Sequence, residues 1–316
     1  MKKSQVKSSL HPNNLHQGQY DLEALCGALP ELSTHVFENA YGNLSINFAD
    51  AEAVKSLNRA LLAHFYQIKF WDIPAGFLCP PVPGRADYIH YAADLLAQSN
   101  SGKHPDGSKV KVLDIGCGAN LIYPILGNAI FGWKFIGAEV NPIAIHSARK
   151  IIDENPHLKG KIEVIAQTGT NHIFQNIIQA DDFFDLTICN PPFHDSAESA
   201  AVGSIRKLSN LAEKRVKKVD LNFGGQDAEL WCPGGEVAFI QKMVAESVKF
   251  RNQVFWFTSL LSKSENLKAI QEAVKKAGAL EFKIIPMAQG NKKSRFVAWT
   301  FLDLKQQENW RKFRWA

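Results

Sequence analysis

The sequence has few cysteines and no long apolar run, and each of these absences excludes a class of protein. Its 316 residues include five cysteines, with no CxxC pair and no cluster of histidines and cysteines, which argues against a disulfide framework and against a zinc site. No apolar stretch is long enough to span a membrane, and the amino terminus lacks the apolar segment of a secretion signal. We therefore expect a cytoplasmic protein with free thiols, no membrane contact and no bound metal.

The chain is mildly basic and long enough to bury a full core. Its net charge is +5 and its pI is near 8.8, which allows an acidic partner without requiring one. The length fits one large α/β domain with additions or two small domains. Residues 1–20 carry three lysines and no acid, and they read either as a disordered terminus or as a basic arm that binds phosphates.

Strand and helix patterns alternate along the middle of the chain. Apolar or β-branched runs predict strands at 110–115, 134–138, 161–166, 184–189, 253–259, 281–285 and 295–302. Helical spacing of apolar residues predicts helices at 143–152, 172–178, 236–250 and 266–277. Such alternation favours a parallel sheet, but no helix fits between the last two strands, which should pair antiparallel. The fold class is therefore α/β, with a seven-stranded, mostly parallel sheet whose last strand is antiparallel.

Composition divides the chain into parts. We predict a basic arm and helical extension at 1–108, an α/β core at 109–304 with a basic insertion at 194–234, and a basic tail at 305–316. A helix of the extension should begin after Asp50, a good N-cap. The tail, which contains three aromatic residues, reads as an amphipathic helix or as an interaction tail.

A glycine turn follows the first predicted strand of the core. Gly116 and Gly118 let the backbone approach a ligand closely, and Asp114 before them can accept from a ligand amine. The third glycine of a dinucleotide fingerprint is replaced by Leu121, so the pattern suits the amino-acid end of S-adenosylmethionine better than a pyrophosphate. Glu139 ends the next strand, where an acid accepts from ribose hydroxyls; the alternative is a solvated acid at a helix start.

Asn190 ends the fourth predicted strand and is followed by Pro191, Pro192 and Phe193. The Asn190 side-chain oxygen and the Pro191 carbonyl can each accept one hydrogen of an exocyclic amine, which localises the nitrogen lone pair. Phe193 can stack on a base. The plainer interpretation is a strand that ends in an Asn-Pro turn.

Two further positions are candidates for cofactor binding. Arg85 begins a predicted helix after a proline-rich loop, where its planar fork could clamp a carboxylate or phosphate. The alternative is an ordinary surface arginine. Thr168 lies at the end of the third core strand, where the adenine edge of a bound nucleoside would lie.

The insertion and the last predicted hairpin carry candidate RNA-binding residues. They are Arg206, Lys207, Lys214, Arg215, Lys217, Lys218, Lys292, Lys293 and Arg295. A long loop that leaves directly from the Asn190 tip favours a flap that contacts phosphates. A solvated charged surface is the alternative.

Five segments together resemble a known family. They are Trp71–Tyr91, Asp114–Pro124, Asn190–Ser196, Leu221–Gly225 and Met287–Trp299. They are similar to class I S-adenosylmethionine-dependent N6-adenine methyltransferases, and most closely to the bacterial 23S ribosomal RNA adenine-1618 N6-methyltransferases. The resemblance implies a Rossmann-like fold, S-adenosylmethionine as cofactor and 23S rRNA or a pre-50S assembly intermediate as substrate. It also implies cofactor contacts by Arg85, Gly116 and Glu139 and a catalytic role for Asn190–Phe193. We expect a monomer.

Two other functions use the same residues. A protein glutamine amide poses the same electronic problem as a nucleobase amine, and a non-catalytic RNA-binding protein could keep a relic cofactor site. Phe193 and the basic insertion favour a nucleic acid, and the presence of Asp114, Glu139 and Asn190 favours an enzyme.

Overall fold

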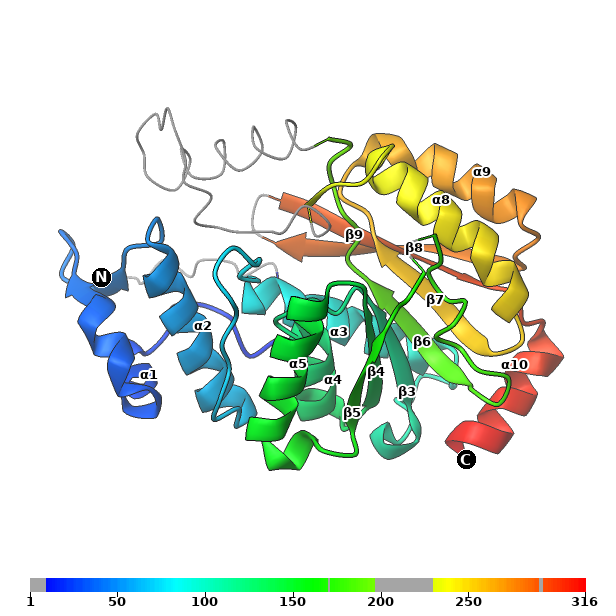
Figure 1. The fold of residues 1–316 in the computed structure, drawn as a ribbon. Helices are drawn as coiled ribbons and strands as arrows, with labels where there is room; N and C mark the ends of the chain where they lie inside the picture. Colours follow the sequence, from blue (N-terminus) through cyan, green and yellow to red (C-terminus); the bar gives the residue numbers. More distant parts are fainter. Residues whose placement is uncertain (1–9, 170, 197–229, 290–291) are drawn as a thin grey trace, which may run out of the picture.

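The computed structural model describes residues 10–169, 171–196, 230–289 and 292–316 (Figure 1). Its centre is a seven-stranded sheet with the order β5-β4-β3-β6-β7-β9-β8. The strands are β3 (Lys111–Ile115), β4 (Lys134–Glu139), β5 (Ile162–Ala166), β6 (Phe184–Cys189), β7 (Val254–Leu260), β8 (Glu281–Gln289) and β9 (Lys292–Thr300). β9 runs opposite to the other six strands of this sheet and pairs antiparallel with β7 and β8. The predicted α/β fold class, including the antiparallel last strand, is confirmed.

Helices cover both faces of the sheet, as Figure 1 shows. They are α3 (Val82–Gln98), α4 (Ile122–Phe131) and α5 (Pro142–Glu154) on one face, and α8 (Gly235–Ser247) and α9 (Leu267–Lys276) on the other. Successive side chains of β3 point to opposite faces, so Val112 joins the first hydrophobic cluster and Leu113 joins the second. The sheet is therefore buried on both sides, and its accessible functional positions are the ends of its strands.

The helix predicted at 172–178 is wrong, because this segment forms turns. The Glu246 carboxylate on α8 accepts hydrogen bonds from the backbone N–H groups of Ile173, Phe174 and Gln175 at 2.6–3.0 Å. Asn176 then has a left-handed φ of 72°, which an α-helix does not allow. A distant acid thus satisfies the backbone that a helix would have satisfied.

The amino-terminal part packs on the body of the fold. It contains α1 (Leu22–Ala28), η1 (Pro30–His35), the β1 (Val36–Glu38) and β2 (Leu44–Ile46) hairpin, and α2 (Ala51–Tyr66). The Asp50 side chain caps α2, as predicted. Leu57 and Leu61 of α2 belong to the same hydrophobic cluster as Val112 of β3. The division into extension, core, insertion and tail stays a prediction.

The structure describes residues 1–20 only from residue 10 onward. This part of the segment is packed against the fold and is not a free arm. His11, Asn14 and His16 are buried. The backbone N–H of His11 and the side-chain amide of Asn14 both donate to Asp87 on α3, at 2.9 and 2.7 Å. These contacts anchor the segment, and the three lysines lie before it, outside the described residues.

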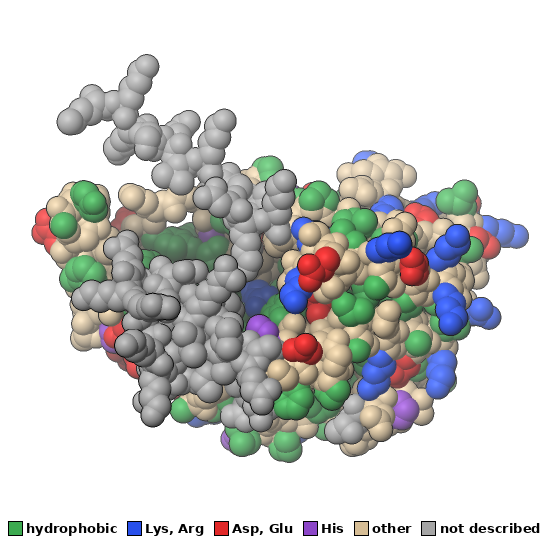
Figure 2. Space-filling model, turned by 90° about the horizontal axis from the view of Figure 1, so that it is seen from above, with side chains coloured by type: hydrophobic (Ala, Val, Ile, Leu, Met, Phe, Trp, Pro, Cys, Tyr) green, Lys and Arg blue, Asp and Glu red, His purple; other side chains and the backbone are tan. Residues whose placement is uncertain are grey.

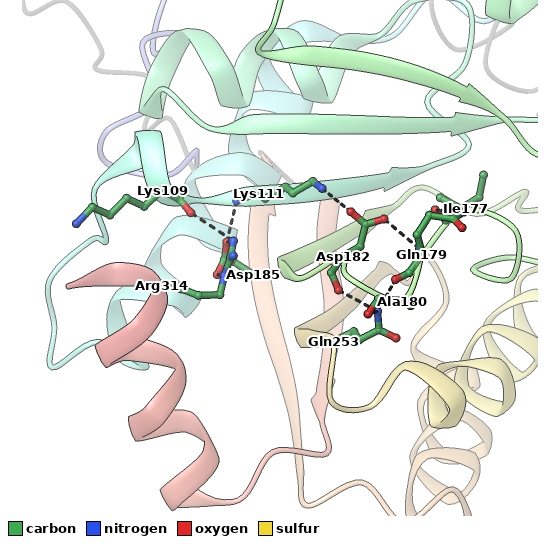
Figure 3. A network of polar contacts seen from close by, with 9 residues as sticks. All are labelled: Lys109, Lys111, Ile177, Gln179, Ala180, Asp182, Asp185, Gln253 and Arg314. Carbon is green, nitrogen blue, oxygen red and sulfur yellow. Dashed lines mark hydrogen bonds and ion pairs between the residues drawn. The ribbon is translucent and has the colours of Figure 1, made fainter.

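The carboxy-terminal tail is part of the fold. It forms α10 (Leu304–Trp310) and the π-helical turn η6 (Arg311–Trp315). The buried Asp185 carboxylate at the start of β6 accepts from the indole N–H groups of Trp310 and Trp315 at 2.7 and 2.8 Å. Figure 3 shows the Arg314 side chain directed at the same carboxylate, at 2.9 Å. Of the two alternatives for the tail, the structure thus contains the helix.

Four short 3₁₀ turns complete the secondary structure of the described residues. They are η2 (Gly107–Lys109), η3 (Pro156–Leu158), η4 (Val248–Phe250) and η5 (Ser264–Asn266). Within the described ranges, no helix combines the length and apolar character that crossing a membrane requires.

Candidate active site

A cavity of about 470 Å³ opens at the carboxyl ends of β3, β4 and β6. In an open α/β sheet this edge is where ligands bind. The predicted site residues that line the cavity are Arg85, Gly116, Gly118, Glu139, Asn190 and Pro192. They come from α3, from the turn after β3, and from the tips of β4 and β6. Residues far apart in the sequence thus meet in one place, as the strand pattern predicted.

The other predicted site residues do not line this cavity. Asp114 is fully buried in β3, and Pro191 is buried between Asn190 and Pro192. Phe193 is half-buried, and Thr168 is exposed at the end of β5. Gln167, the residue before Thr168, lines the cavity instead. The predicted strand end thus lies at the cavity, with Gln167 rather than Thr168 in its wall, and the role of Thr168 stays a prediction.

The glycine turn is fixed to the neighbouring strand by hydrogen bonds. Gly116 and Gly118 have left-handed φ values of 70° and 65°, which side chains with a Cβ rarely adopt. The Gly118 N–H donates to one Glu139 oxygen at 3.0 Å. The other Glu139 oxygen accepts from the N–H groups of Val140 and Asn141 at 2.8 and 2.9 Å. The acid at the tip of β4 thus orients the turn as well as facing the cavity.

Arg85 and Asp114 place ionisable groups near the glycine turn. An Arg85 terminal nitrogen donates to the Tyr123 hydroxyl at 2.6 Å, while its buried Nε has no partner among the described residues. Both Asp114 carboxylate oxygens are likewise buried without a described hydrogen-bond partner. Burial raises the pKa of Asp114 well above its usual range, Glu139 adds to the rise, and Arg85 opposes it. Polar groups left unsatisfied beside a cavity fit a ligand that carries both an amine and a carboxylate.

Asn190 presents its side chain to the cavity directly after the buried Cys189. Its Oδ1 is buried and has no hydrogen-bond partner among the residues that the structure describes. A buried amide oxygen costs free energy unless it accepts a hydrogen bond. The arrangement provides an acceptor that a ligand with an N–H group would satisfy.

The two ends of the insertion meet beside Asn190. The His194 N–H donates to the Leu230 carbonyl at 3.1 Å, and the Cys232 N–H donates to the His194 carbonyl at 3.0 Å. His194 and Trp231 form a parallel bridge. This short ladder places Trp231 and Cys232 in the cavity wall.

Comparisons with known proteins identify the family. A family model described as RNA methyltransferase matches residues 4–303. The chain belongs to this RNA methyltransferase family. It is 53% identical to ribosomal RNA large subunit methyltransferase F of Ectopseudomonas mendocina (strain ymp), a match that covers 100% of this chain and 95% of the relative. The protein of that name from Flavobacterium psychrophilum is 54% identical, over 96% of this chain and 97% of its own length.

Solved structures agree with the family assignment. The hMettl16 catalytic domain in complex with the MAT2A 3′UTR hairpin 1 superposes with a TM-score of 0.78 at 28% identity, covering 94% of this chain and 97% of that one. The amino-terminal domain of human METTL16 in complex with SAH has a TM-score of 0.73 at 26% identity, covering 93% and 99%. The resemblance inferred from sequence motifs is thereby confirmed for fold, family and enzyme class.

The predicted RNA-binding residues of this RNA methyltransferase are mostly not placed. Arg206, Lys207, Lys214, Arg215, Lys217 and Lys218 lie outside the described residues, and only the backbone of Lys292 and Lys293 is described, in β9. Arg295 donates to the Ser262 carbonyl at 3.4 Å. Figure 2 shows other Lys and Arg side chains on the side of the molecule where Figure 1 places α8 and α9, with acidic side chains among them. These roles stay predictions.

Sequence reasoning missed several residues that line the cavity. They include Phe77, Tyr123, His172 and Trp231. Phe77 and Tyr123 lie within segments that carry the family resemblance, so their neighbours gave a usable signal. Trp231 lies near the end of the insertion, and nothing in the local sequence indicates that the chain returns to the cavity there. Among the described residues, no group of three or more His, Cys, Asp or Glu could hold a metal ion.

Proposed function

We propose that this RNA methyltransferase transfers a methyl group from S-adenosylmethionine to N6 of an adenine in 23S rRNA of the large ribosomal subunit. One observation carries the proposal: the unpartnered Asn190 oxygen lies in the same cavity as the Gly116–Gly118 turn and Glu139. The names of its relatives, which specify large-subunit ribosomal RNA, support the choice of substrate.

The chain's residues fit the methyl donor, which supplies an activated methyl group on a sulfonium. Gly116 and Gly118 offer a close approach to backbone, and Glu139 has remaining acceptor capacity for ribose hydroxyls. Arg85 has an unpaired Nε for the carboxylate of the amino-acid end. Asp114, and Thr168 at the end of β5, complete the proposed cofactor contacts. Neither residue lines the cavity, so both contacts require a local movement when the cofactor binds.

Asn190 and Pro191 orient the nucleophile. The lone pair of an adenine amine is delocalised into the ring, so accepting both amine hydrogens at Asn190 Oδ1 and at the Pro191 carbonyl favours attack. Pro192 shapes the wall, and Phe193 stacks on the base. A carboxamide is not a base, so these groups position the amine while its surplus proton leaves to solvent after transfer. Most of the acceleration then comes from positioning.

The form of the substrate is a further part of the proposal. An adenine must leave its stack to reach the cavity, which favours a loop or an unpaired segment. The basic residues of the insertion and of β9 would contact the surrounding phosphates, either in naked 23S rRNA or in a pre-50S assembly intermediate. A monomer that acts in the bacterial cytoplasm fits this substrate.

The Asn190→Ala variant tests the proposal. It should abolish methyl transfer to 23S rRNA, measured with labelled cofactor, while the Kd for S-adenosylmethionine changes by less than about threefold, because the cofactor contacts are retained. Asn252→Ala, which removes an exposed amide before β7, is the matched control and should keep full activity. Near wild-type turnover by Asn190→Ala would contradict the assigned role of Asn190. Mass mapping of rRNA from cells lacking the protein should show one missing N6-methyladenine.

A further inference from the structure

Besides Arg85, two residues that line the cavity, Asn190 and Trp231, each have a buried polar atom without a hydrogen-bond partner among the described residues, and these two atoms are chemically opposite. Asn190 Oδ1 is an acceptor, and Trp231 Nε1 is a donor. An indole N–H has no acceptor capacity, so only an acceptor atom can satisfy it. An unpaired buried donor is costly, which points to a partner that is present only in the complex.

The backbone holds Trp231 close to the Asn190 tip. His194, four residues after Asn190, is bonded on both sides of Trp231, to Leu230 and to Cys232. The following turn is also packed against this segment, because a Cβ placed on Gly235 would lie 3.4 Å from the backbone nitrogen of Asp195. The position of the indole is therefore tied to the position of the proposed catalytic tip.

The pair of unmatched atoms is complementary to one edge of adenine. The N6 amine donates, and the ring nitrogens on either side of it, N1 and N7, accept. Guanine presents the O6 acceptor in place of the amine and an N1–H donor in place of the N1 acceptor. An acceptor at Asn190 and a donor at Trp231, two residues that line the same cavity, thus match adenine, whereas guanine would place an acceptor at Asn190 Oδ1.

We propose that Trp231 is a specificity-determining residue that recognises the target adenine, by donating its indole N–H to the ring nitrogen beside the reacting amine, N1 or N7. The inference rests on the proposed function and adds the base-reading contact to it. Asn190 and Pro191 hold the amine hydrogens, and Trp231 fixes the rotation of the base within its plane. A site that hydrogen-bonds a substrate atom rejects analogues that lack the atom.

The test combines a protein change with an atomic change in the RNA. The substrate is a synthetic RNA fragment around the methylated adenine, made with adenosine, 1-deazaadenosine or 7-deazaadenosine at that position. Wild-type protein should lose roughly ten- to hundredfold in kcat/KM on one of the two deaza substrates. Trp231→Phe should lose a similar factor on adenosine RNA and should no longer distinguish that deaza substrate from adenosine.

A second tryptophan provides the matched control. Trp256→Phe removes an indole N–H that donates to Ser99 Oγ at 2.9 Å, away from the cavity, and it should keep the wild-type sensitivity to the deaza substrates even if it lowers stability. The inference is overturned if Trp231→Phe retains full sensitivity, or if its only change is a weaker Kd for S-adenosylmethionine, which would assign the indole to the cofactor. Failure of the wild-type protein to methylate any RNA would instead contradict the proposed function.

Discussion

Glu139 accepts a hydrogen bond from the backbone N–H of Gly118 at 3.0 Å, and this contact joins the tip of β4 to the turn after β3. The same carboxylate accepts from Val140 and Asn141. One acid therefore shapes two consecutive parts of the cavity wall. Its contribution to cofactor binding includes holding the backbone as well as contacting the ligand.

Replacing Glu139 should weaken cofactor binding and stability together. Glu139→Ala leaves three backbone N–H groups without their acceptor, which should lower the free energy of unfolding by about 1–3 kcal/mol. The Kd for S-adenosylmethionine should rise at least about tenfold, measured by calorimetry. Glu139→Gln should fall between Ala and wild type, because its amide keeps one acceptor oxygen. Glu163→Ala, at an exposed position of β5, is the control and should change neither quantity.

A methyl group at Gly137 should displace the glycine turn. A Cβ at this position of β4 would lie 2.8 Å from Cys117 Sγ and 2.9 Å from Cys117 Cβ, closer than atoms pack in proteins. Gly137→Ala should therefore reduce cofactor affinity by about tenfold or more, an estimate based on an overpacking cost of about 1–3 kcal/mol. The additional Cys117→Gly change removes both clashing atoms and should restore part of the affinity. Normal affinity in the single variant would show that the turn shifts without consequence.

The sequence predicted those features whose cause is local. The Asp50 cap, the strand that ends at Cys189 and the glycine turn each depend on residues within a few positions. The antiparallel last strand followed from the short spacing between β8 and β9, which leaves no room for a crossover helix. These features define the sheet and one edge of the candidate site.

The features that were missed depend on distant contacts. The turns at 172–178 exist because Glu246, more than 70 residues away, accepts hydrogen bonds from their backbone. The spacing of apolar residues within the segment carries no information about such a distant acceptor. Trp231 is held at the cavity by its bridge to His194, and this bridge joins the two ends of the insertion. The burial of His16 between two tyrosine hydroxyls was also not visible in a stretch without periodicity.

Asp185 should be the residue on which docking of the tail depends. It is fully buried and accepts from the indoles of Trp310 and Trp315. It also accepts from Arg314 and from the Lys111 backbone (Figure 3). Asp185→Ala leaves these donors buried and unpaired, so it should cost about 3–5 kcal/mol of unfolding free energy in denaturant titrations. Arg314→Ala should cost less, because Arg314 is partly exposed. Lys312→Ala, which breaks an exposed pair with Glu308, should cost under about 1 kcal/mol. A smaller loss for Asp185→Ala than for Arg314→Ala would contradict this order.

Two buried histidines at the amino-terminal segment should make the stability of the protein depend on pH. His16 lies 2.7 Å from the Tyr66 hydroxyl and 3.0 Å from the Tyr20 hydroxyl, and burial lowers its pKa to about 4. His90 on α3 stacks on His11 with ring centroids 5.0 Å apart. Burial, and then the neighbouring His11, lower the pKa of His90 to about 4. Both side chains are therefore neutral in the folded protein at neutral pH.

Stability should fall as the pH drops from about 6.5 to about 4. In this window the unfolded chain binds a proton at each histidine, whose unfolded pKa is about 6.5, while the folded protein does not, so the free energy of unfolding rises with pH. Each histidine should contribute at most about 3 kcal/mol, fully present above pH 6.5. His90→Phe keeps an aromatic ring and removes the titrating group, so denaturant titrations across this range should show a shallower slope. His146→Gln, at an exposed position of α5, should keep the wild-type slope. An unchanged slope for His90→Phe would contradict the assigned contribution of His90.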